Sequence, residues 1–188
     1  MQYDILDILP NIYYYIYMTV EIKQYSEVLK QMFHKERSRL KLILPENVVI
    51  EHVGSSSVGI GGKNIVDILI GAKKKADFRK IRDILVCNGY YEGHDSHEDR
   101  LFLASRPSET RAGDVHIHIC LTGSPCYEDF LILRKYLLNH PTEAKLYYEK
   151  KKEFAFLARY DRKEYKKLKS SYVSELLDKA RQEDKEAN

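Results

Sequence analysis

The chain has 188 residues, of which 44% are hydrophobic and 31% charged, and its formal net charge is +3. This length suits one domain with a buried core, while so small a charge gives no electrostatic reason to expect a nucleic-acid partner. No apolar run reaches the roughly 18 residues needed to cross a bilayer, so we expect no membrane span.

The first residues are rich in Ile and Tyr, but they lack the basic flank and the small-residue cleavage site of a signal peptide. We interpret residues 1–17 as an N-terminal extension and residues 18–188 as a single domain. The alternative is that residues 1–17 form an extra strand or helix that packs on the core.

The middle of the chain alternates between helices and strands. Apolar spacing predicts an amphipathic helix over residues 26–44, ended by Pro45. Strands are predicted at 48–53, 65–71, 90–92, 101–104 and 115–121, with one helical turn at 55–58, a helix at 77–87 and a turn at 106–113. The run at 65–71 is apolar on both faces except at Asp67, as in a central strand, whereas 90–92 is predicted to be an edge strand.

The C-terminal part is predicted to be helical. Residues 127–181 fit two or three helices, the second of which starts at Pro141. Asp161 is the predicted N-cap of a final helix that ends near Ala180, followed by a frayed tail. The fold class is therefore α+β, with a small mixed sheet, flanking helices and a C-terminal helical bundle.

The number and spacing of the cysteines indicate the redox state of the cellular compartment. Cys87, Cys120 and Cys126 are odd in number, and no Cys-x-x-Cys pair occurs. This usage predicts reduced thiols and a cytoplasmic location.

A Gly-Ser turn and a buried acid are the most informative polar features. The backbone N–H and hydroxyl groups of Gly54-Ser55-Ser56-Ser57 can receive a phosphate, or the serines can simply cap the turn. An ionised Asp67 within an apolar strand is costly unless a cation or hydrogen bonds satisfy it. Together these residues indicate a metal-assisted phosphate site, the alternative being a buried Asp bonded to the loop N–H groups.

A histidine pair supplies a second candidate cluster. His116 and His118 are two residues apart on a predicted strand, so both imidazoles face the same side. With one acid from a neighbouring strand they form a two-His, one-acid set, which suits Zn²⁺, Mn²⁺ or Fe²⁺. Alternatively, one histidine faces the core. Glu51 and His52 point to opposite faces, and Glu51 is a candidate additional metal ligand or a polar residue at a strand edge.

Several basic residues complete the set. Lys63 can neutralise phosphate charge, and Arg100 can reach an anionic substrate or pair with Glu98 or Asp99. Basic residues interleaved with tyrosines on the C-terminal helices can bind nucleic acid, but we interpret them mainly as a solvated helix face. They are Arg134, Lys135, Lys150, Lys151, Lys166, Lys167 and Lys169.

These motifs, in this order, resemble the GrpB family (UPF0157) of the nucleotidyltransferase superfamily. The resemblance rests on 50–58 with Lys63, 65–68, 116–118, 133–137, His140-Pro141, Tyr147-Tyr148, Lys150-Lys151, Tyr165 and Lys169. It implies a nucleotidyltransferase-like mixed sheet in which Asp67 holds Mg²⁺, with Mn²⁺ or Zn²⁺ as alternatives. It further implies that Gly54–Ser57 hold nucleotide phosphates, that the histidine pair lies near Asp67, and that Arg134, Tyr165 and Lys169 face the cleft.

We therefore expect a protein that binds a nucleotide and a divalent metal and transfers a nucleoside monophosphate to a small molecule or other acceptor, with Asp67, His116 and His118 as catalytic residues. Leu69 stands where the superfamily usually places a second acid. That departure favours the alternative of a non-catalytic ligand-binding or regulatory module. A metal-dependent hydrolase built on the same three residues is the other alternative.

Overall fold

The computed structural model describes residues 19–94, 96–105 and 114–186. One mixed five-stranded sheet has the order β1-β2-β5-β4-β3. Its strands are β1 (Val49–Val53), β2 (Val66–Ala72), β3 (Tyr90–Glu92), β4 (Arg100–Ser105) and β5 (Val115–Leu121). Only the pairing of β2 with β5 is parallel. The predicted α+β class and mixed sheet are confirmed, with β2 inside the sheet and β3 at its edge.

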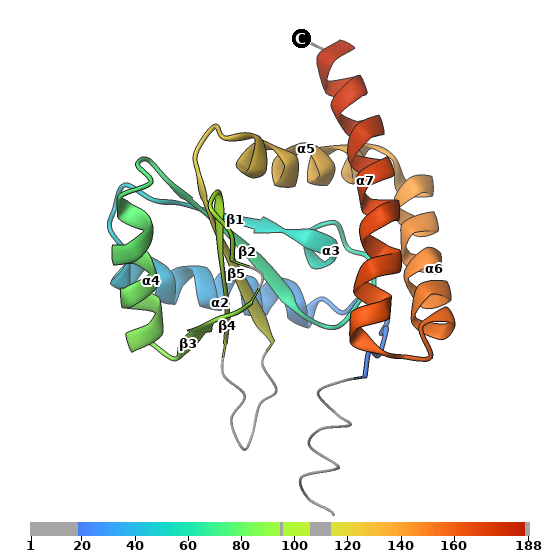
Figure 1. Ribbon diagram of the computed structural model, residues 1–188, viewed down its shortest axis with the longest axis horizontal. Coiled ribbons are helices and arrows are strands. Elements are labelled where there is room, and N and C mark those ends of the chain that lie inside the picture. The colour runs from blue at the N-terminus through green and yellow to red at the C-terminus, as the bar shows by residue number, and fades with distance from the viewer. Residues whose placement is uncertain (1–18, 95, 106–113, 187–188) are drawn as a thin grey trace, which may run out of the picture.

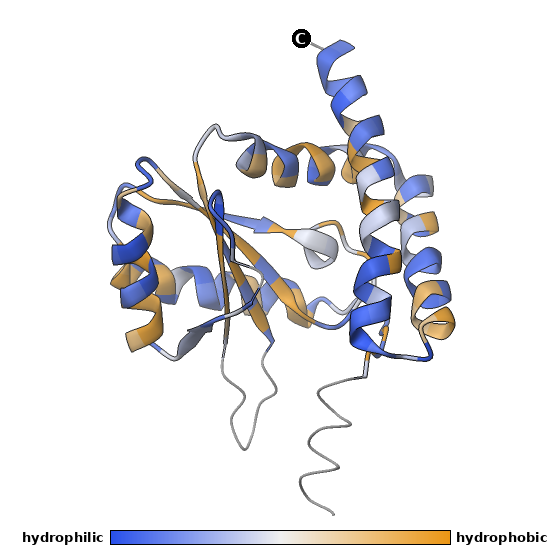
Figure 2. Ribbon diagram, viewed as in Figure 1, coloured by the Kyte–Doolittle hydropathy of each residue, from blue (hydrophilic) through white to orange (hydrophobic). Residues whose placement is uncertain are grey.

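Two helices cover one face of the sheet (Figure 1). These are α2 (Val28–Ile43) and α4 (Asp77–Cys87), and their apolar sides pack against the strands in a single core cluster. Strand alternation supplies the partners, because Ile68 and Ile70 of β2 and Ile117 of β5 project to this face and are fully buried. Figure 2 shows β2 largely in the colour of hydrophobic residues, whereas β1 and β3 include hydrophilic stretches.

The other face of the sheet meets α5 (Pro125–Asn139). Tyr127 and Phe130 of this helix pack on Val53, Leu69 and Cys120. Helices α6 (Pro141–Leu157) and α7 (Arg162–Glu186) pack against α5 and against each other beside the sheet (Figure 1). No described helix is both long and apolar enough to cross a membrane.

The last helix is longer than its sequence predicts. We expected it to end near Ala180 with a frayed tail, but α7 continues to Glu186. Arg181 bonds Asp129 at 2.8 Å, and Lys135 pairs with Asp184 at 2.7 Å. These ion pairs join the polar end of α7 to α5, an interaction that local helical periodicity cannot show. The Asp161 cap is confirmed, since its Oδ1 accepts from Glu164 N at 2.8 Å.

Two expected segments fall outside the described residues, namely the extension at 1–17 and the turn at 106–113. From Val20 onward the chain runs across the C-terminal helices toward the Gly-rich loop. Val20 N donates to Tyr160 O at 2.8 Å, and Lys23 N donates to Gly62 O at 2.7 Å. The segment therefore connects the α6–α7 turn to the loop that precedes β2.

Candidate functional site

An acid and two imidazoles meet in the middle of the sheet. In the parallel pairing of β2 with β5, Asp67 lies beside His116 and Leu69 beside His118. Asp67 Oδ1 is 3.3 Å from His116 Nδ1 and 3.6 Å from His118 Nε2. The expected proximity of the histidine pair to Asp67 is therefore present, on the sheet face that α5 partly covers.

The cluster favours an ionised Asp67. Burial alone would raise the pKa of the carboxyl, but hydrogen bonds from the two imidazoles outweigh it and hold the pKa well below its usual range. Burial also lowers the pKa of His118, so this ring is neutral near pH 7. Its Nδ1 is buried without a hydrogen-bond partner among the described residues. The site thus pairs a carboxylate with an imidazole able to accept a proton.

The turn after β1 is pressed against this acid. Gly54 has φ +70°, and a Cβ at this position would overlap Asp67 Oδ2. Only glycine gives both this backbone conformation and this close approach. The short helix α3 (Gly54–Ser57) begins there, so the Gly-Ser sequence brings the backbone of the turn to the carboxylate.

The three serines of the turn have different partners. Ser56 is buried, and its Oγ lies 2.9 Å from His52 Nε2 on the α2 side of the sheet. Ser57 Oγ donates to Gly54 O at 2.7 Å. Ser55 Oγ accepts from Lys151 Nζ at 2.9 Å. Ser55 alone therefore faces a cation, whereas Ser56 and Ser57 have structural hydrogen bonds.

Lys151 is the main functional candidate that sequence reasoning missed, because we assigned it to a solvated helix face. It is only 2% exposed. Besides Ser55, it donates to Gly61 O, and its ammonium lies 4.6 Å from the centre of the Tyr147 ring. Burial, with added repulsion from Lys169, lowers its pKa to about 7. The structure therefore directs a buried lysine at the Gly-Ser turn.

A signal for Lys151 was present in the helical spacing. The buried residues of α6 are Ala144, Tyr147, Lys151 and Ala155, which recur at intervals of three or four. This spacing puts the lysine on the inward stripe of the helix rather than on its polar side. Tyr147, on the same stripe, is itself buried, and burial raises its pKa despite a hydrogen bond with Ser55.

Glu51 and Arg134 form a pair of their own. Arg134 Nη1 on α5 is 2.8 Å from Glu51 Oε2, and it also donates to the carbonyl of His52 at 2.7 Å. The predicted metal ligand and the predicted phosphate ligand thus bond each other. His52 faces α2, where it stacks on Phe33 with ring centres 4.2 Å apart. Arg134 therefore joins α5 to the strand that leads into the Gly-Ser turn.

Four further residues were predicted from the sequence to belong to the site, namely Arg100, Lys63, Tyr165 and Lys169. Arg100 is opposite Cys120 across β4 and β5, and its charge helps to lower the pKa of His118. Lys63 follows Gly62 in the loop before β2. Tyr165 is buried against Val20 in the apolar cluster of the C-terminal helices, away from solvent. Lys169 is close enough to Lys151 to lower its pKa, so it belongs to the same cationic group.

A ready-made metal cage is absent from the part of the chain described. No three His, Cys, Asp or Glu side chains there are arranged to hold an ion. This arrangement does not suit a structural Zn²⁺ site, which takes four protein ligands. Mg²⁺ differs, because it is usually held by one or two carboxylates together with waters and substrate phosphates. The ionised Asp67 beside the Gly-Ser turn is a single carboxylate of the kind that this second mode uses.

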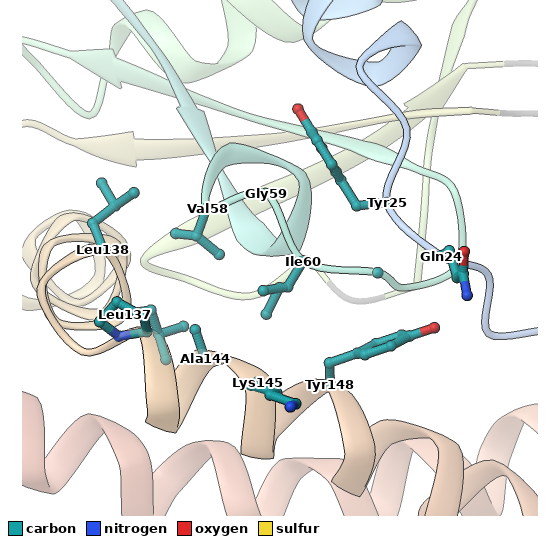
Figure 3. Close-up of a pocket in the computed structure, with 12 residues that line it drawn as sticks. Gln24, Tyr25, Val58, Gly59, Ile60, Leu137, Leu138, Ala144, Lys145 and Tyr148 are labelled. Atoms are coloured by element: carbon teal, nitrogen blue, oxygen red, sulfur yellow. The ribbon is translucent and has the colours of Figure 1, made fainter.

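A shallow hollow lies on the far side of the Gly-rich loop (Figure 3). Its volume is about 360 Å³, and Tyr25, Ile60, Leu137 and Tyr148 are among the residues that line it. Asp67, the two histidines and Ser55 do not line it. Gly61 belongs to its wall while its carbonyl accepts from Lys151, so the loop separates this apolar hollow from the polar site.

The GrpB protein family model matches residues 19–179, which include every residue of this site. The chain belongs to the GrpB family. The UPF0157 protein YqkA of Bacillus subtilis is 32% identical over 139 residues, a match that covers 72% of this chain and 40% of that protein. The chain thus spans less than half the length of this relative. The family expected from the sequence motifs is confirmed.

The solved structure of a GrpB protein agrees with this assignment. The crystal structure of the conserved protein GrpB from Enterococcus faecalis is 26% identical, with a TM-score of 0.74 over 85% of this chain and 96% of that chain. A more distant overlap, with a TM-score of 0.43 and 14% identity, covers 61% of this chain and 38% of the Cid1 poly(U) polymerase. The GrpB structure is therefore the comparison that describes the fold of this chain.

Proposed function

We propose that this GrpB-family protein binds a nucleoside triphosphate together with a divalent metal ion at the Gly54–Ser57 turn. The observation that carries the proposal is Lys151, a lysine buried to 2% exposure that donates to Ser55 in that turn. No carboxylate of the described residues forms a salt bridge with this ammonium, and a buried ammonium is unfavourable unless an anion compensates it. Phosphate oxygens are suitable acceptors, because they bring charge as well as hydrogen-bonding capacity.

Different residues would contact different parts of the metal–nucleotide complex. Ser55, Lys151 and Lys169 would hold the terminal phosphates. Asp67, ionised because the imidazoles lower its pKa, would hold the metal ion that arrives with the nucleotide, and Mg²⁺ is the ion that this single-carboxylate arrangement suits. When bound, the ion neutralises phosphate charge and orients the phosphates. Arg134 is engaged with Glu51 and serves to position the turn.

If the bound nucleotide reacts, the site supports transfer of a nucleoside monophosphate. His118 is neutral because burial lowers its pKa, so it can take the proton of an acceptor hydroxyl. The hydroxyl oxygen then attacks the α-phosphorus, and the bond to pyrophosphate breaks as pyrophosphate leaves. The acceptor would be a small molecule or another hydroxyl-bearing substrate.

A second candidate function is binding without transfer. Leu69, where the superfamily usually has its second acid, is fully buried among Val53, Cys120 and Tyr127. A site with one metal-binding carboxylate stabilises less developing charge than a site with two. This observation favours a regulatory module that senses nucleotide.

Calorimetric titration tests the binding proposal. Each of the four common nucleoside triphosphates is titrated with Mg²⁺, Mn²⁺ or Zn²⁺ into the wild type, Asp67→Asn, Lys151→Met and the control Lys152→Met, whose lysine is exposed on the same helix. Loss of a hydrogen bond from a charged donor costs about 1.5–3 kcal/mol, so Lys151→Met should weaken binding by roughly ten- to a hundredfold. Asp67→Asn should remove the metal dependence, and Lys152→Met should change little.

The outcomes separate the candidates. Absence of binding with every metal, or equal affinity in Lys151→Met and wild type, would overturn the proposal. Binding accompanied by pyrophosphate release when pooled hydroxyl acceptors are added identifies a transferase. Binding without release in the same pools supports the sensing module.

A further inference from the structure

Two thiols lie in contact at the end of β5, beside the candidate site. Cys120 is the next residue after His116 and His118 to project to the same face of the strand, and it is fully buried. Cys126 is in the first turn of α5 and is partly exposed. The two sulfur atoms are 3.1 Å apart.

The backbone produces this contact. After β5 the chain turns back at Gly123, whose φ is +78°, and Ser124 N donates to Leu121 O at 3.0 Å. Ser124 then caps α5, because its Oγ accepts from Tyr127 N at 3.3 Å. A left-handed glycine, a turn bond and a helix cap together fix the first turn of α5 over Cys120. The pair is thus set by main-chain geometry and needs only a small side-chain movement to form a bond.

The environment gives the two thiols different roles. A hydrogen bond with Cys120 lowers the pKa of Cys126 to about 7, and the positive charge of Arg100 acts in the same direction. Cys120 is fully buried, whereas Cys126 is partly exposed. The more exposed sulfur is therefore the better thiolate and the buried one its partner, as expected of an attacking and a resolving cysteine.

We propose that Cys120 and Cys126 are a reversible thiol–disulfide site whose oxidant is hydrogen peroxide. The Cys126 thiolate attacks one peroxide oxygen, the O–O bond breaks, and the hydroxide that leaves takes a proton to become water. The sulfenic acid on Cys126 is then attacked by the Cys120 thiol. An S–S bond forms, and the hydroxyl group leaves with the thiol proton as a second water.

The bond would link α5 covalently to the strand that carries both histidines. Phe130, one turn further along α5, already packs on the His118 ring with ring centres 4.8 Å apart, and Arg134 on the same helix bonds Glu51. Oxidation would therefore fix the position of α5 over the site. This disulfide would form whether or not a nucleotide binds.

Peptide mass mapping of the full chain tests the proposal. Residues 112–134 contain both cysteines and no internal Lys or Arg, so trypsin releases the pair on one peptide. After hydrogen peroxide, acid quench and alkylation, we expect this peptide to lose two hydrogens and to take no alkyl group. Dithiothreitol should restore two alkylation sites. Exposed Cys87, on the tryptic peptide 83–100, is the single-thiol reference.

Variants make the test specific. In a Cys87→Ser background the pair should still form the link, with the chain monomeric on a non-reducing gel. Cys126→Ser should abolish the two-hydrogen loss and leave Cys120 alkylatable. The proposal is overturned if peptide 112–134 keeps two alkylation sites at peroxide doses that consume Cys87, or if the only disulfides formed join separate chains.

Discussion

Replacing Lys151 with methionine should change how stability depends on pH. Its ammonium is 2% exposed, and burial moves its pKa from 10.5 to about 7. At about 1.4 kcal/mol per pH unit, that shift corresponds to roughly 5 kcal/mol of unfavourable burial when the lysine is charged. Methionine fills a similar space without a proton to lose.

The sign follows from proton linkage. Between pH 7 and 10.5 the unfolded chain holds this proton while the folded protein has released it, so folding stability rises with pH over that window. Between pH 6 and pH 9 the folded lysine loses its proton near pH 7, and the pH then rises two further units. Lys151 should therefore add about 3 kcal/mol to the wild-type free energy of unfolding across that range.

Urea unfolding at pH 6, 7, 8 and 9 measures this effect in the wild type, Lys151→Met and Lys152→Met. The hydrogen bonds lost with Lys151 shift the variant by an amount that does not depend on pH. The diagnostic quantity is therefore the difference in slope, with the wild type and Lys152→Met rising together and Lys151→Met lacking about 3 kcal/mol of the rise. Parallel curves for wild type and Lys151→Met would refute the reasoning, because Lys151 would then titrate alike in both states.

Three further predictions follow from the same geometry. Nucleotide affinity should fall by up to about tenfold per pH unit between pH 7 and 9, because the bound phosphate needs charged Lys151. Binding at pH 8 should therefore take up a proton, which calorimetry in buffers of different ionisation enthalpy detects. Gly54→Ala should lower stability by at least about 2 kcal/mol more than Gly59→Ala in thermal melts, since both have positive φ but only Gly54 abuts Asp67. Equal effects at the two glycines would contradict that contact. Asp67→Asn should destabilise the protein by about 1–3 kcal/mol at pH 7. Because the folded pKa of Asp67 is depressed, this difference should persist down to about pH 4 and then narrow progressively as pH falls toward the folded pKa; acid titration by circular dichroism compares the two proteins.

Local sequence patterns predicted the elements of this fold well. The helix at 77–87 and the strands at 90–92 and 115–121 have the predicted bounds, because Gly, Pro and alternation mark their ends. The single acid in the β2 run correctly identified Asp67 as the centre of a polar cluster. Alternation also placed His116 and His118 on one face, and both meet Asp67 there.

The sequence did not predict contacts between residues that are far apart in the chain. Lys151 is separated from Ser55 by 96 residues, and the charge of its side chain alone predicts exposure. Arg134 was expected at the cleft, but its bond to Glu51 depends on how α5 crosses β1. The end of α7 was misjudged for the same reason, since Arg181 and Asp184 are held by residues of another helix. Spacing along one element cannot show which surface another element will cover.

The strand order gives β5 a special place in assembly. β1 with β2 and β3 with β4 form two antiparallel pairs from chain that precedes β5, and β5 is the strand between them. Two-stranded pairs are marginally stable by themselves, so a continuous sheet forms only when the last strand inserts. The strand that carries both imidazoles and Cys120 therefore also completes the sheet. Substitutions at these positions that weaken the pairing of β5 should also slow refolding. Refolding rates should therefore be measured together with any activity or binding of the site variants.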